Sequence, residues 1–280
     1  MTRPMEEMMK IGCMLESFAI DLKLAVARAA ALGCTGIQAY AVDGELAPQN
    51  MNDAIIREWL DRVKSHGMVF SAICGDLSAT PEAVGHGFEN RDANPVLVEK
   101  SKRILDLAKK LECNVVTTHI GTVPVEENET KKIMREACRE LALYADSIGS
   151  YFAVETGPEM AVVLRDFLDS LGAKGVRVNY DPANLVMVVA DDPVAGVHTL
   201  RDYIVHTHAK DGIQVSANPL KWQELPLGQG GVKWDEYLKA LHAVGFDGYL
   251  TIERECGDTP EADIKMAANF LRERLTALAL

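Results

Sequence analysis

Short apolar segments alternate with helix-like segments along nearly the whole chain of 280 residues. Eight of the apolar segments have the composition of β-strands, and a segment long enough for an α-helix follows each of them. Strands that alternate with helices favour a parallel sheet, and eight repeats fit a closed barrel of about 250 residues. The sequence therefore predicts a single (β/α)8 TIM barrel that spans residues 1–280 as one domain. The predicted strands are residues 10–15, 36–40, 68–73, 113–119, 151–155, 176–181, 203–208 and 247–253.

The stretch after the first predicted strand distinguishes this fold from its main alternative, a doubly wound open sheet. Such a sheet normally carries a glycine-rich phosphate-binding turn there, whereas this chain has Glu16-Ser17-Phe18. No linker rich in proline, glycine or serine divides the chain, which favours one domain. Two long stretches, residues 74–94 and 211–232, lack clear periodicity and are predicted to be irregular loops, a kind of segment that is often functional.

The composition restricts the partners that this chain can have. The formal net charge is −12, and a strongly acidic surface repels the phosphate backbone of a nucleic acid. No apolar run reaches the roughly 20 residues of a membrane helix, and the N-terminus has no apolar signal core. The six cysteines are scattered and form no CxxC pair, which is typical of reduced thiols. These features predict a cytoplasmic protein without a nucleic-acid or membrane partner.

Four successive predicted strands end on a carboxylate or a histidine: Glu155, Asp181, His208 and Glu253. The C-terminal ends of parallel barrel strands open on one face, so these side chains can converge. One polar residue at a strand end is usually only solvated, but four in succession indicate a site. Crowded like charges are costly unless a cation holds them. Three carboxylates and one imidazole suit Mn²⁺, Mg²⁺ or Co²⁺ better than metals that prefer thiolates.

A metal at this position predicts chemistry next to a carbonyl. It would polarise the carbonyl of a ketose and stabilise the enediolate that forms when the neighbouring C–H loses its proton. Glu155 and Glu253 would flank the bound sugar. One could remove the proton and the other could return it from the opposite face, which inverts that carbon.

At the level of motifs, the sequence resembles the xylose isomerase-like TIM-barrel superfamily. That superfamily includes sugar phosphate isomerases and epimerases, ketose 3-epimerases, inosose isomerases and dehydratases, and endonuclease IV enzymes. The resemblance covers essentially the whole chain. The matching motifs are Thr118-His119-Ile120-Gly121, Glu155-Thr156-Gly157-Pro158-Glu159, Asn179-Tyr180-Asp181-Pro182-Ala183-Asn184, His206-Thr207-His208-Ala209-Lys210-Asp211, Pro226-Leu227-Gly228-Gln229-Gly230 and Ile252-Glu253.

The resemblance implies that Glu155, Asp181, His208 and Glu253 hold one divalent metal ion. Mn²⁺ is the first expectation, with Mg²⁺, Co²⁺ or Zn²⁺ as alternatives. It further implies that Glu155 and Glu253 are the catalytic acid/base pair, that the substrate is a sugar or polyol, and that the protein forms a homodimer or homotetramer. The chain departs from the ketose 3-epimerases at Asn184, where they carry a substrate-contacting histidine, and it lacks their arginine within residues 211–232. The additional histidines of the endonucleases are also missing.

Five further residues are candidates for contact with the substrate: Cys74, His119, Glu159, Asn184 and Lys210. His119 either contacts substrate or makes an ordinary hydrogen bond at a strand end. Glu159 could bond a sugar hydroxyl or favour the start of the next helix through its dipole. Lys210 could neutralise charge near the metal or pair with Asp211, and we expect a salt bridge just outside the metal ligands. Cys74 either lines the pocket or is a buried thiol.

The sequence thus predicts a metal-dependent isomerase or epimerase of a sugar or cyclitol. One alternative uses the same site for elimination, as a dehydratase or as a lyase or hydrolase of keto-sugars such as inososes or 3-keto-glycosides. A second alternative, of another class, is a sugar-binding barrel without catalytic activity.

Overall fold

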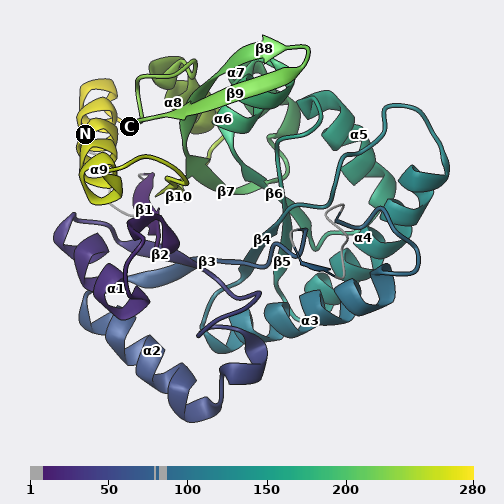
Figure 1. Cartoon of the computed structure of the whole chain (residues 1–280), viewed down its shortest axis with the longest axis horizontal. Helices are drawn as coiled ribbons and strands as arrows, with labels where there is room; N and C mark the ends of the chain where they lie inside the picture. Colours follow the sequence, from purple (N-terminus) through teal and green to yellow (C-terminus); the bar gives the residue numbers. More distant parts are fainter. Residues whose placement is uncertain (1–8, 79, 82–86) are drawn as a thin grey trace.

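Eight parallel strands form a closed barrel at the centre of the computed structural model, which describes residues 9–78, 80–81 and 87–280 (Figure 1). The barrel strands are β1 (Lys10–Met14), β2 (Gly36–Tyr40), β3 (Val69–Cys74), β4 (Val115–Thr118), β5 (Tyr151–Glu155), β6 (Val176–Tyr180), β7 (Ile204–Ala209) and β10 (Tyr249–Ile252). Around the barrel their order is β1–β10–β7–β6–β5–β4–β3–β2, and every neighbouring pair is parallel. The predicted (β/α)8 fold is confirmed.

Helices surround the barrel on its outside (Figure 1). The longer ones are α1 (Leu22–Ala31), α2 (Asp53–Ser65), α3 (Asn94–Lys110), α4 (Glu129–Ser147), α5 (Ala161–Leu171), α7 (Pro193–Leu200), α8 (Trp234–Ala243) and α9 (Pro260–Leu278). The short α6 (Pro182–Asn184) and a π-helical turn at Leu185–Val189 lie between β6 and α7. No helix of the described residues is both long enough and apolar enough to cross a membrane.

Sequence features explain where the helices begin and how they pack. The Asn52 side chain accepts hydrogen bonds from the N–H groups of Ala54 and Ile55, which caps α2. The Asn128 side chain accepts from the N–H of Lys131, which caps α4, so that helix begins at Glu129. Each helix buries one stripe of apolar side chains. In α2 the buried residues are Ile56, Trp59 and Val63, at helical spacing.

Polar side chains occupy the inside of the barrel near the C-terminal ends of its strands. The Gln38 amide on β2 donates to Thr117 Oγ1 on β4 over 2.8 Å, and Gln38 Oε1 lies 3.0 Å from His208 Nε2 on β7. β2 is a barrel neighbour of neither β4 nor β7, so these contacts cross the interior. All three side chains are buried. The interior at this level is therefore a hydrogen-bonded polar layer.

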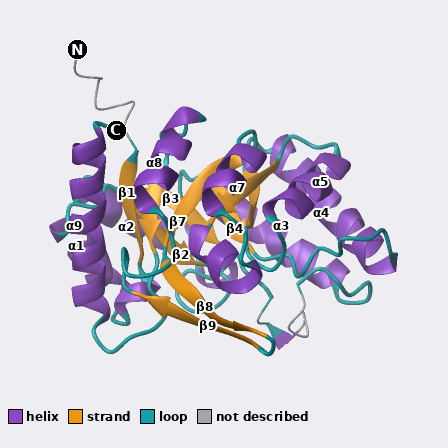
Figure 2. Ribbon diagram, turned by 90° about the horizontal axis from the view of Figure 1, so that it is seen from above, coloured by secondary structure: helices purple, strands orange, loops and turns teal. Residues whose placement is uncertain are grey.

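Residues 211–232, predicted to be an irregular loop, contain an antiparallel hairpin, so that prediction was wrong. Its strands are β8 (Asp211–Ala217) and β9 (Leu220–Leu225). Figure 2 shows this hairpin outside the barrel, and it starts only two residues after β7 ends. Exposed Ile213 and Val215 alternate with partly buried polar residues, which is the period of a half-buried strand. This signal was present in the sequence but was short.

The Asp211 carboxylate fixes the base of the hairpin. Its Oδ1 accepts the N–H groups of Gly212 at 2.9 Å and Val232 at 3.1 Å. Its Oδ2 accepts the N–H of Gly228 and the indole Nε1–H of Trp234, both at 2.9 Å. Asp211 is fully buried. One side chain thus joins the end of β7, both ends of the hairpin segment and the start of α8.

We predict that Asp211→Ala lowers the free energy of unfolding by about 3–5 kcal/mol, because four N–H donors lose a charged acceptor. Asp211→Asn keeps one acceptor oxygen and should lose less. Urea unfolding followed by circular dichroism measures both effects. The control is Asp202→Ala, which removes a carboxylate that is 84% exposed and should change stability by less than about 0.5 kcal/mol. If Asp211→Ala is as stable as the wild type, these bonds do not hold the hairpin.

Candidate metal centre

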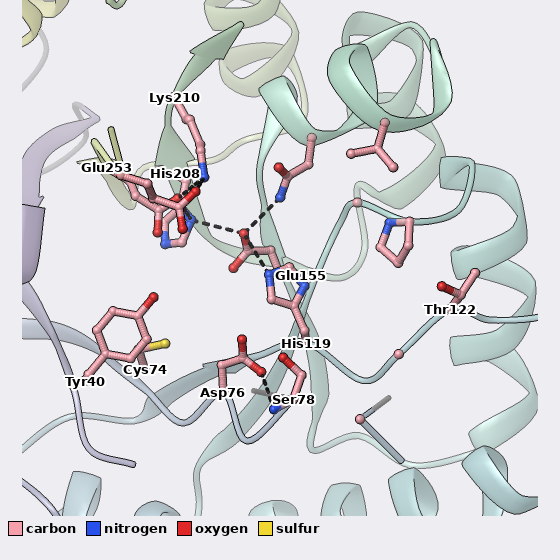
Figure 3. Close-up of a pocket in the computed structure, with 17 residues that line it drawn as sticks. Tyr40, Cys74, Asp76, Ser78, His119, Thr122, Glu155, His208, Lys210 and Glu253 are labelled. Carbon is pink, nitrogen blue, oxygen red and sulfur yellow. Dashed lines mark hydrogen bonds and ion pairs between the residues drawn. The ribbon is translucent and has the colours of Figure 1, made fainter. Parts of the chain in front are cut away.

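Four side chains from four barrel strands meet at the C-terminal face of the barrel. Glu155 is the last residue of β5, Asp181 and Glu253 follow β6 and β10 directly, and His208 lies near the end of β7. All four are buried, and their potential ligand atoms lie within 4.8 Å of one another. Figure 3 shows Glu155, His208 and Glu253 converging from separate strands. The structure therefore brings together the four residues that the sequence grouped, in an arrangement that could hold a metal ion.

The His208 ring is at the centre of this group. Its Nδ1 lies 3.1 Å from Glu253 Oε2, 3.4 Å from Glu155 Oε1 and 3.8 Å from Asp181 Oδ2. Its other nitrogen, Nε2, points away from the carboxylates. One nitrogen and three carboxylate oxygens thus face a common point.

The three carboxylates of this group are stabilised by nearby positive charge, as the pKa values of its members show. Burial alone would lower the pKa of His208, yet the Glu253 and Glu155 carboxylates raise it well above its usual value. Burial alone would raise the pKa of Glu253, yet the charges of His208 and Lys210 hold it far below its usual value. Burial raises the pKa of Asp181, and its Oδ2 has no hydrogen-bond partner among the described residues. An unpartnered, buried carboxylate oxygen aimed at this point fits a bound cation.

Two amide side chains orient Glu155. Asn179 Nδ2 donates to Glu155 Oε2 over 3.0 Å, and Asn184 Nδ2 donates to Glu155 Oε1 over 3.1 Å. Asn184 also donates to the carbonyl oxygen of Thr156 over 3.1 Å, which fixes its own position. Asn184, predicted as a substrate contact, therefore also holds Glu155 in place.

Lys210 forms a salt bridge beside the candidate metal centre, but its partner is not Asp211, so that pairing was wrong. Its Nζ lies 3.1 Å from Glu253 Oε2 and also pairs with Glu255. The Asp211 carboxylate instead accepts hydrogen bonds from the N–H groups at the base of the hairpin. Adjacent residues in an extended segment point to opposite sides, so Lys210 faces the barrel mouth while Asp211 faces away. The position of Lys210 matches the other interpretation, which was neutralisation of charge beside the candidate metal centre.

A cavity of about 320 Å³ opens next to the four residues (Figure 3). Of the predicted substrate contacts, four line it: Cys74, His119, Asn184 and Lys210. Among the polar residues of the lining, the prediction missed Tyr40, Asp76, Ser78, Thr122 and Glu255. Tyr40 ends β2 as Glu155 ends β5, but the prediction considered only strands that end on a carboxylate or a histidine. Asp76 and Ser78 lie in the long loop that was expected to be functional, where no periodic pattern singles out a residue.

His119 is part of the cavity lining. Its Nε2 is 3.6 Å from Glu155 Oε1, and its side chain is 35% exposed. Burial would lower the pKa of His119, but the charges of Glu155 and Asp76 raise it above its usual value. The imidazole therefore lies beside Glu155 in the cavity lining.

Glu159 does not line the cavity, in contrast to the prediction for a substrate contact. It is buried, and its Oε2 accepts the N–H of Val123 over 3.1 Å. Its Oε1 has no hydrogen-bond partner among the described residues. Burial raises the pKa of Glu159 to about 7. Glu159 thus fastens the loop after β4, and the ionised form is disfavoured there.

This burial makes the stability contribution of Glu159 depend on pH. An unfolded chain ionises Glu159 near pH 4.5, whereas the folded protein does so near pH 7. Stability is therefore lost as the pH rises between these values, and the loss is complete above pH 7. We predict that Glu159→Gln gains up to about 3 kcal/mol over the wild type on going from pH 4.5 to pH 8. Urea unfolding at both pH values measures the gain. The exposed control Glu126→Gln should show none, and an equal response from the two variants would contradict the prediction.

One curated relative and three solved structures show what this chain is similar to. The relative is the uncharacterized protein MJ1311 of Methanocaldococcus jannaschii, which is 23% identical over 180 residues. The match spans 59% of this chain and only 59% of the length of that relative. Among solved structures, a xylose isomerase domain protein from Planctomyces limnophilus superposes with a TM-score of 0.84 at 23% identity. This superposition covers 97% of this chain and 98% of that one.

Two further structures carry names that describe activities. A D-tagatose 3-epimerase-like protein has a TM-score of 0.77 at 18% identity and covers 96% of this chain and 98% of its own. The probable 3-DHS dehydratase AsbF of Bacillus anthracis has a TM-score of 0.73 at 18% identity and covers 94% and 99%. At these identities the likeness shows the fold alone.

The family assignment comes from the sequence profile. The profile of the family described as xylose isomerase-like TIM barrel matches residues 26–274, which is most of the chain. The match includes every strand of the barrel except β1. It also contains all four residues of the candidate metal centre. The chain therefore belongs to the xylose isomerase-like TIM-barrel family.

Proposed function

We propose that this protein is a divalent-metal-dependent isomerase or epimerase that moves a proton next to the carbonyl of an uncharged sugar or polyol. One observation carries the proposal. Glu155 and Glu253 are buried carboxylates on non-neighbouring barrel strands, and both line one small cavity beside His208. A pair of carboxylates on two sides of a ligand is the arrangement that proton removal and return require.

Glu155, Asp181, His208 and Glu253 would hold the metal. Oxygen donors with one imidazole favour Mn²⁺ or Mg²⁺, with Co²⁺ or Zn²⁺ as alternatives. A divalent cation bound there would supply Lewis-acid polarisation of the substrate carbonyl. The unpartnered Asp181 Oδ2 supports this choice of ligands.

The two carboxylates then exchange protons with the substrate. One accepts the proton of the C–H next to the carbonyl, and the other returns a proton to the same carbon from the opposite face, which gives an epimer. If the proton returns to the carbonyl carbon instead, a ketose becomes an aldose. Lys210 favours the ionised form of Glu253, while Asn179 and Asn184 fix the direction of the Glu155 oxygens.

The size and charge of the cavity support a small, uncharged substrate. At about 30 Å³ per water, a volume of 320 Å³ holds about ten water molecules, which is the scale of a monosaccharide. Asp76 and Glu255 add negative charge to the lining. Lys210 is already paired with two carboxylates. A phosphate group would therefore meet repulsion with no unpaired lysine or arginine among the described lining residues.

Removal of metal should abolish turnover. We expect dialysis against EDTA to eliminate activity and added Mn²⁺ to restore it, because the carbonyl is not polarised without a Lewis acid. The measurement is the initial rate with the most reactive substrate among ketoses, inososes and 3-keto-sugars. The metal content of the same samples is determined in parallel. Full activity in protein shown to be free of metal would refute the metal-dependent mechanism.

Deuterium exchange identifies the reaction. The Mn²⁺-loaded protein is incubated in D₂O with ketoses, inososes and 3-keto-sugars, and each C–H signal is followed by NMR. We expect exchange next to the carbonyl, at least about 10²-fold slower in Glu155→Gln and Glu253→Gln when these are loaded with metal. The exposed control Glu126→Gln should exchange like the wild type. Phosphorylated counterparts of active sugars should react more slowly.

The pattern of exchange separates the alternatives. Deuterium at C3 with a new epimer establishes an epimerase, and deuterium at C1 with a new aldose establishes an isomerase. Exchange with loss of water or of an aglycone establishes elimination, the alternative that fits the name of one structural neighbour. Sugar binding without exchange in the metal-loaded protein would support a non-catalytic barrel and would exclude the proposed reaction for those sugars.

A further inference from the structure

Gln38 is a polar residue in the middle of a barrel strand, and its side chain is completely buried. It does not line the cavity. Its two amide atoms face different strands across the barrel interior. Nε2 donates to Thr117 Oγ1 over 2.8 Å, and Oε1 lies 3.0 Å from His208 Nε2. A buried amide is retained at a cost unless both ends are satisfied, and here both ends are.

The contact with Gln38 makes the two nitrogens of His208 different. A neutral imidazole carries one N–H, and its position decides which nitrogen can bind a cation. Gln38 Oε1 can only accept a hydrogen bond, so it keeps the proton on Nε2. A cation that binds the ring must displace the proton on Nδ1, and Nδ1, which faces the Glu253, Glu155 and Asp181 carboxylates, then presents its lone pair to the centre of the group.

The reverse orientation of the Gln38 amide would have the opposite result. Its NH₂ group would then donate to Nε2, and the single imidazole proton would lie on Nδ1. That proton would point at Glu253 Oε2, 3.1 Å away, and would occupy the direction from which a cation binds. Asn179 Nδ2 does not select between the two, because it lies 3.2 and 3.4 Å from the two ring nitrogens and donates to Glu155 over 3.0 Å.

We propose that Gln38 is a positioning residue that makes His208 a metal ligand through Nδ1. The inference rests on the proposed metal site and deepens it. Gln38 lies outside the cavity lining, so it would act through the ring of His208. Such an outer hydrogen bond to a ligating histidine typically changes metal affinity by about 10–100-fold.

Metal affinity of matched variants tests the proposal. Gln38→Leu removes the acceptor at similar size, and Mn²⁺ should bind about 10–100-fold more weakly in competition with a fluorescent chelator. Gln38→Glu keeps an acceptor oxygen for Nε2–H, so its affinity should return close to that of the wild type. The control Gln214→Leu removes an amide that bonds the carbonyls of Met187 and Val188, away from the four carboxylate and imidazole ligands, and should bind Mn²⁺ normally. Wild-type affinity in folded Gln38→Leu would overturn the proposal.

NMR of the wild type provides a test that does not depend on how the variants fold. In Zn²⁺-loaded protein with ¹⁵N-labelled histidine, His208 should show a protonated Nε2 and a Nδ1 shifted by the metal. A proton on Nδ1 with Zn²⁺ on Nε2 would overturn the inference while leaving the metal-dependent reaction intact. Absence of Mn²⁺ and Zn²⁺ binding by the wild type would instead overturn both the proposed function and this inference.

Discussion

Mutual repulsion of three buried carboxylates is the constraint around which the C-terminal face of this barrel is built. Glu155, Asp181 and Glu253 are buried and place ligand atoms within 4.8 Å of one another and of His208. Such a group is stable only if positive charge and hydrogen-bond donors surround it. The neighbouring residues supply both, and one oxygen of Asp181 is left for something further. Stability and the capacity to bind a cation thus have the same physical origin.

The two candidate acid/base residues are supported in different ways. Glu253 has a charged partner, Lys210, which is itself shared with Glu255. Glu155 receives neutral amide donors from Asn179 and Asn184. A charged partner stabilises the ionised form strongly, whereas neutral amides mainly set direction. The carboxylates therefore differ in environment although they have the same chemical group, and such a difference is what distinct roles in proton transfer need.

The polar layer inside the barrel connects this chemistry to the fold. Asn179 Oδ1 on β6 lies 2.8 Å from His206 Nδ1 on β7, and His206 Nε2 lies 2.8 Å from Thr251 Oγ1 on β10, so the residue that orients Glu155 is held by a chain of contacts through two successive neighbouring strands. Burial lowers the pKa of His206 far below its usual value, which keeps that ring neutral. A neutral ring can accept from Thr251 while it donates to Asn179. The interior thereby supplies rigid orientation without adding a further charge.

The sequence by itself determined the barrel and the four converging residues, because both follow from local patterns. Strand and helix segments alternate, and the ends of parallel strands always share one face. The tertiary structure alone decided which partner each polar group takes. Lys210 selects Glu253, 43 residues away, over the adjacent Asp211, and His208 meets Gln38, 170 residues away. Tertiary packing likewise decided that a hairpin follows β7 and that Glu159 is buried, with its carboxylate accepting the N–H of Val123. Hydrogen-bond partners are chosen by distance and direction in three dimensions, and spacing along the chain carries neither.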